Sequence, residues 1–165
     1  MLFISPPVSF YRGVFMGGRK LLLSTIAFTV IFQISHMAGA FLDMPYYTDA
    51  GMAGVWSKIM MPGPAPPAEF YLLSIFSSMV IGAIFSFGFT LVGHSFASKH
   101  AFKADPPHIV GAKYGLFVFA LAGFGNLTMP LLFNIPFGLA FSWALQSLVT
   151  YVLAGAAAGK ILGKK

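Results

Sequence analysis

The stretch FYLLSIFSSMVIGAIFSFGFTLVGHSF, residues 70–96, decides the fold of this chain. It contains no charged side chain, and as a helix rising about 1.5 Å per residue it is long enough to cross a hydrocarbon core of about 30 Å. Small or polar residues recur at every fourth position, which places them in one narrow stripe on a helix otherwise covered by large apolar side chains. The stripe consists of Ser74, Ser78, Gly82, Ser86, Thr90 and His94. A helix surrounded only by lipid has no need of such a stripe, so it predicts packing against a second helix.

The composition assigns the whole chain of 165 residues to the membrane class. Hydrophobic residues make up 58% of it and charged residues 8%, whereas a soluble domain carries about 25% charged residues. The absence of cysteine from the sequence excludes disulfides, thiolate metal sites and cysteine nucleophiles. The formal net charge is +6. In a membrane protein we expect basic residues to set the topology and contact anionic lipid, and we expect no nucleic-acid partner.

Three further apolar segments predict three further membrane-spanning helices. With the opening stretch they give spans at about 21–41, 70–96, 114–133 and 138–162, joined by an outer loop at 42–69, a cytoplasmic loop at 97–113 and a tight turn. Within the outer loop, residues 51–61 are expected to form a short interfacial helix with Trp56 at the level of the headgroups. The predicted fold is therefore an all-α integral membrane protein, with four transmembrane helices in one bundle that forms a single domain over 1–165.

The basic residues predict the orientation of this bundle. Of the 10 lysine and arginine residues, only Lys58 falls in the predicted outer loop. The other basic residues all fall on the opposite side of four spans: Arg12, Arg19, Lys20, Lys99, Lys103, Lys113, Lys160, Lys164 and Lys165. The positive-inside rule then places both termini in the cytoplasm. We expect a multi-pass protein of a prokaryotic cell membrane, N-in and C-in.

The last span repeats the four-residue spacing of the opening stretch, from Gly138 to Ala158. Under the predicted topology these two spans run in the same direction, so we expect their stripes to face each other in a parallel pair. The predicted helix-packing seam comprises Ser74, Ser78, Gly82, Ser86, Thr90, Ser142 and Thr150.

Four polar side chains exceed what close helix packing requires: Gln33, His36, Asn126 and Gln146. One interpretation is structural: the amides Gln33, Asn126 and Gln146 each bond a neighbouring helix, and His36 can be bonded by Gln33. The other is that they converge on a polar interhelical cavity that accepts a small molecule. His36 is the only ionisable group clearly inside a predicted span, and such groups are functional candidates by default.

Recognisable catalytic and metal-binding motifs are missing from the sequence. It contains no P-loop, no dinucleotide fingerprint, no G-x-S-x-G and no H-E-x-x-H. The gaps between His94, His100 and His108 match no closed zinc signature. We therefore expect no catalytic residue, no cofactor and no metal.

These observations leave three hypotheses for the function. The packing stripes and the lack of catalytic groups favour a non-catalytic structural or interaction subunit, which packs with itself or with a larger membrane assembly. The alternative is a homo-oligomeric carrier or channel for a small neutral or hydrophobic molecule, which would use the polar cavity. A membrane enzyme that acts on lipid through His36 and the outer acidic loop has the least support, because no nucleophile lies beside a base. Membrane lipid is an expected partner in every case.

Overall fold

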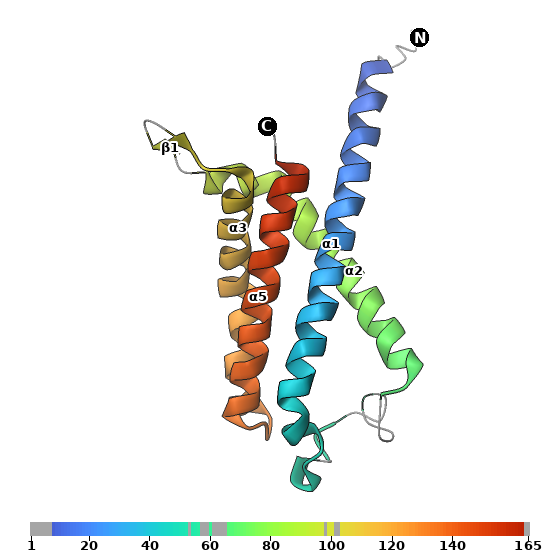
Figure 1. Cartoon of the computed structure of the whole chain (residues 1–165), viewed down its shortest axis with the longest axis vertical. Coiled ribbons are helices and arrows are strands. Elements are labelled where there is room, and N and C mark those ends of the chain that lie inside the picture. Colours follow the sequence, from blue (N-terminus) through green and yellow to red (C-terminus); the bar gives the residue numbers. More distant parts are fainter. Residues whose placement is uncertain are drawn as a thin grey trace, which may run out of the picture.

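The computed structural model of the chain is almost entirely helical (Figure 1). It describes residues 8–52, 54–56, 60, 66–97, 99, 100 and 103–163, with side chains for 17–52, 54–56, 60, 66–97 and 105–163. The elements are α1 (Val8–Tyr47), η1 (Ala50–Met52), α2 (Ala68–Val92), η2 (Gly93–Phe96), β1 (Lys99–His100), β2 (Lys103–Ala104), α3 (Pro107–Ala122), η3 (Gly123–Thr128), α4 (Met129–Leu132) and α5 (Phe137–Leu162). The strands β1 and β2 form a two-stranded antiparallel pair.

Four helical segments are long and apolar enough to cross a membrane, which confirms the predicted number and class. They are Gly17–Tyr47, Ala68–Phe96, Pro107–Leu132 and Phe137–Leu162. Large apolar side chains such as Leu22, Ile34 and Leu72 are exposed along them, which suits a protein surrounded by lipid rather than water. Figure 1 shows α1 beginning and α5 ending at the same end of the molecule, which we call the terminal end. The opposite end, where η1 lies, is the loop end.

The helices α3 and α5 pack antiparallel with their backbones in direct contact. Gly111 and Gly115 of α3 face Gly155 and Gly159 of α5, and a Cβ atom added at any of the four would overlap backbone of the facing helix. Each pair has the G-x-x-x-G spacing that lets two helices approach this closely. The sequence prediction overlooked this seam, since it placed residues 97–113 in a loop.

The stripe on α2 packs against α1, and not against α5 as expected. Ser78 and Ser86 are fully buried, and Ser86 shares a hydrogen bond of 2.8 Å with Ser24 of α1. Gly82 lies against the side chain of Phe28. The expected parallel pair does not form because the closest approach of α5 is already made to α3 through the glycines.

The members of the predicted seam therefore differ in their roles. Ser74 contacts α1 through Gln33, and Ser142 accepts a hydrogen bond within α5. Thr150 is buried. Thr90 is exposed, and its hydroxyl donates to the carbonyl of Phe87 on its own helix. The hydrogen bonds of Ser142 and Thr90 thus lie within their own helices, and their part in the seam stays a prediction.

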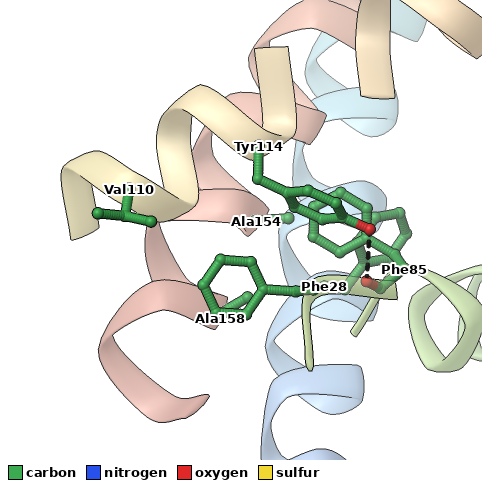
Figure 2. Packing of buried hydrophobic residues seen from close by; sticks show 7 residues of the cluster. Phe28, Phe85, Val110, Tyr114, Ala154 and Ala158 are labelled. Atoms are coloured by element: carbon green, nitrogen blue, oxygen red, sulfur yellow. Dashed lines mark hydrogen bonds between the residues drawn. The ribbon is translucent and has the colours of Figure 1, made fainter. Parts of the chain in front are cut away.

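The buried core joins all four long helices in the half of the bundle nearer the terminal end. Figure 2 shows Tyr114 of α3 donating a hydrogen bond of 2.9 Å to the carbonyl oxygen of Phe85 on α2. The core comprises Phe28, Phe85, Phe89, Val110, Tyr114, Ala154 and Ala158. Beyond this core α2 slants away from the other helices toward the loop end (Figure 1). The space between α1, α2 and α5 therefore widens in that direction.

Two helices are longer than the sequence predicted. The first was expected over 21–41, but α1 continues to Tyr47 with Pro45 inside it, because a proline there removes a single backbone hydrogen bond. Asp43 therefore belongs to this helix, which corrects the expectation that the spans hold no carboxylate. The third span was expected from Tyr114, but α3 begins with Pro107 in its first turn, where proline is favoured. Of the expected interfacial helix at 51–61, the structure shows η1 at its start, and residues 53, 57–59 and 61 lie outside the described part.

Candidate functional site

A cavity of about 700 Å³ lies between α1, α2, η3 and α5 in the half of the bundle nearer the loop end. It occupies the region where α2 has separated from α5. Gln33, His36, Asn126 and Gln146 all line this cavity. The structure thus brings together, from α1, η3 and α5, the four side chains that the sequence singled out. That they bind a ligand stays a prediction.

Gln146 is the centre of the polar wall of the cavity. Its Oε1 lies 3.0 Å from Nδ1 of His36, and its Nε2 donates to Oδ2 of Asp43 at 2.8 Å. The same Nε2 donates to the hydroxyl of Ser142 at 3.1 Å. Gly39 allows the α5 side chain to reach α1, because a Cβ atom at Gly39 would overlap the Gln146 amide.

Gln33 bonds a neighbouring helix, α2, and not His36 of its own helix. Its Nε2 donates to the hydroxyls of Ser74 at 3.1 Å and Ser78 at 3.2 Å. These bonds join α1 to the first half of α2, where the two helices begin to separate. Gln33 therefore fixes one edge of the cavity.

Asn126 and Trp143 fix the opposite edge. The amide of Asn126 donates to the hydroxyl of Ser147 at 2.9 Å and to the carbonyl of Trp143 at 3.4 Å, which ties η3 to α5. The indole of Trp143 donates to the hydroxyl of Tyr47 at 3.2 Å. Trp56 stacks edge-on against Tyr47, with ring centroids 5.1 Å apart. Tyr47 and Trp143 of this aromatic group line the cavity.

The remaining lining of the cavity is apolar. Aromatic and methionine side chains from α1 and α2 dominate it, and methionine adapts its shape to different partners. They are Phe32, Met37, Phe41, Met44, Phe70 and Tyr71, together with Met60 from the connection between α1 and α2. A largely apolar cavity with a few fixed polar groups is the usual form of a small-molecule site.

Asp43 is the residue that the sequence prediction missed. Its side chain is only 2% exposed, and it lies behind Gln146. A buried carboxylate inside a membrane-spanning helix is costly and is often functional. The available signal was its spacing, because Asp43 follows His36 by seven residues, or about two helical turns, and so lies on the same helix face.

A second hollow of about 500 Å³ lies at the terminal end and includes His94 and Asp105 in its lining. Asp105 forms an ion pair of 2.7 Å with Lys113. Within the described residues, no three histidine, aspartate or glutamate side chains gather closely enough to hold a metal ion. This hollow therefore presents no metal site in the part of the chain that the structure describes.

Comparisons with protein-family models, with curated proteins and with solved structures give no match for this chain. The functional argument is therefore carried by the geometry of the cavity between α1, α2, η3 and α5.

Proposed function

We propose that this protein is a multi-pass membrane protein that binds and carries a small amphipathic molecule in the cavity between α1, α2, η3 and α5. One observation carries the proposal: amide and imidazole side chains from three separate elements line one largely apolar cavity. A volume of about 700 Å³ falls within the range of about 300–1,000 Å³ that is usual for ligand sites.

The lining indicates the chemistry of the ligand. Its apolar body would contact aromatic and methionine side chains such as Phe41 and Phe70, and its polar group would face His36 and Gln146. No lysine or arginine of the described residues lines the cavity, so an anionic group would find no counter-charge there. A neutral polar group on an apolar body fits best.

The interaction-subunit hypothesis is less well supported than this one. It rested on the stripes of small residues, and most of their members pack within the chain. Ser78 and Ser86 are buried on α2, and Thr150, Ala154 and Ala158 are buried on α5. Homo-oligomerisation stays part of the carrier proposal, because four helices are few for a transport path. The molecular mass of the purified protein in mild detergent tests whether it forms a homo-oligomer.

We further propose that both termini face the cytoplasm of a prokaryotic cell. Arg19, Lys20 and Lys160 lie toward the terminal end of the bundle, whereas Asp43 and Glu69 lie toward the loop end. Basic residues near the ends of spans are retained on the cytoplasmic side. The cavity would then lie in the outer half of the membrane.

A pair of phenylalanine substitutions on α1 tests the ligand-binding proposal. Ala40 lines the cavity, so Ala40→Phe fills part of it, whereas Ala38 is exposed outside it and Ala38→Phe serves as the matched control. The protein is purified in lipid nanodiscs, and retained small molecules are extracted and identified by mass spectrometry against empty nanodiscs. We expect wild type and Ala38→Phe to retain an amphipathic compound that Ala40→Phe loses. Equal retention by both variants, or none by wild type, would overturn the proposal.

A further inference from the structure

Asp43 determines which way the amide of Gln146 points. A carboxylate offers only acceptor atoms, so the amide group that faces it must be the NH₂ donor. That donor reaches Asp43 Oδ2 at 2.8 Å. The amide is planar, so its carbonyl oxygen Oε1 points the other way, toward Nδ1 of His36 at 3.0 Å. The orientation of Gln146 therefore follows from the buried carboxylate behind it.

The orientation of Gln146 in turn determines the tautomer of His36. An amide oxygen only accepts hydrogen bonds, so Nδ1 of His36 must be the nitrogen that carries the proton. In the neutral imidazole Nε2 is then an acceptor with a free lone pair. Within the described residues, Nε2 of His36 has no hydrogen-bond partner, and the ring lines the cavity.

Asn126 leaves an acceptor unused as well, whereas the amide of Gln33 is satisfied by α2. The NH₂ group of Gln33 is directed at Ser74 and Ser78, and its carbonyl oxygen accepts from the hydroxyl of Ser74 at 3.4 Å. The donors of Asn126 are directed at Ser147 and at the carbonyl of Trp143, so its carbonyl oxygen is the part left for a ligand. The ring of Phe32 packs edge-on against His36 with centroids 4.0 Å apart, which holds the imidazole plane. The cavity is thus organised to accept hydrogen bonds.

We propose that Asp43 is a positioning residue that acts through Gln146 to hold His36 in its Nδ1–H tautomer, so that the cavity selects ligands with a hydroxyl or N–H donor. The tautomer is a property of the free protein. The ligand class rests on the proposed function, and the two parts are tested separately.

Nitrogen NMR of ¹⁵N-histidine-labelled protein in nanodiscs tests the tautomer, with His36→Gln identifying the His36 signals. We expect a protonated Nδ1 and a bare Nε2 in wild type. In Asp43→Leu and Gln146→Leu we expect a shift toward the Nε2–H form, which the free histidine side chain prefers in water. Asp49→Leu is the matched control, because Asp49 lies in the exposed turn at the loop end and bonds only its neighbour Gly51. A bare Nδ1 in wild type overturns the proposal without any variant, as does an unchanged tautomer in a folded Asp43→Leu protein.

Two probes of nearly equal shape test the ligand class: 2-naphthol, which has a donor, and 2-methoxynaphthalene, which has none. The chain contains two tryptophans, so Trp56→Phe leaves Trp143 at the cavity as the only reporter for energy transfer to the probe. We expect wild type to prefer 2-naphthol by roughly two- to tenfold, the usual worth of one hydrogen bond, and Asp43→Leu to lose this preference. Equal affinities in wild type overturn the ligand class. Failure of both probes to bind counts against the proposed function, while the NMR result decides the tautomer independently.

Discussion

At the scale of single residues, the polar side chains of the bundle differ in how well their hydrogen-bonding groups are satisfied. Gln33, Asn126 and Gln146 are held by two or more hydrogen bonds each. Thr150 is the contrary case, because its side chain is 2% exposed and its hydroxyl has no partner in the described structure. A buried hydroxyl without a partner costs about 1–3 kcal/mol. Its burial on α5 thus weakens the bundle.

We predict that Thr150→Val stabilises the protein or leaves its stability unchanged, because valine keeps the shape and removes the unpaired hydroxyl. Thr25→Val is the matched comparison, since the Thr25 hydroxyl is also buried but donates to the carbonyl of Leu21 at 3.0 Å. Losing that bond should cost about 0.5–1.5 kcal/mol. Unfolding by SDS in mixed micelles, followed by circular dichroism, measures both. A larger loss for Thr150→Val than for Thr25→Val would contradict the prediction.

The sequence predicted the cavity residues well and their partners poorly. Gln33, Asn126 and Gln146 stand out because amide groups are rare in otherwise apolar spans, and such groups turn toward one another inside a bundle. Their partners depend on the rotation of each helix, which no spacing specifies. Asp43 was missed because the first span was expected to end at residue 41, whereas α1 continues to Tyr47 with Pro45 inside it.

At the scale of elements, the number of long apolar helices follows from apolar composition, but their exact bounds and their pairing do not. A four-residue repeat marks the face of a helix that is buried and leaves open which helix covers that face. The repeat on α2 meets Ser24 and Phe28 of α1. The closest backbone contact instead involves Gly111 and Gly155, and Gly111 lies in a segment that charge and proline content marked as a loop.

This glycine contact predicts that a glycine-to-alanine substitution within a helix lowers the stability of the protein, although such a substitution usually raises the stability of a helix. In Gly155→Ala, the added methyl group would overlap the backbone carbonyl of Gly111, so α3 and α5 must separate. We expect a loss of about 1–3 kcal/mol, as for other overpacked positions, despite the higher helix propensity of alanine. In the control Gly18→Ala, nothing lies within 4 Å of the added atom, and stability should hold or rise. Equal stabilities of both variants in SDS unfolding would show that the backbones are farther apart than described.

At the scale of the whole molecule, the arrangement of charge and the position of the cavity are linked. The four long helical segments alternate in direction, so that α1 begins and α5 ends at the same end of the molecule (Figure 1). The cavity lies in the opposite half, close to the only buried carboxylate of the described residues, Asp43. If the protein carries a ligand as proposed, its orientation decides which side of the membrane supplies that ligand.

The absence of cysteine from the sequence makes this orientation directly measurable. Asn134, between α4 and α5, and Ala97, after η2, are both exposed and lie at opposite ends of the bundle. We predict that Asn134→Cys reacts with a membrane-impermeant maleimide on intact cells, and that Ala97→Cys reacts only after the cells are permeabilised. The basic residues on the Ala97 side provide the physical reason, because moving them across the membrane is unfavourable. The reverse labelling pattern would place the cavity in the inner half of the membrane, where Asp43 and His36 would serve a ligand that arrives from the cytoplasm.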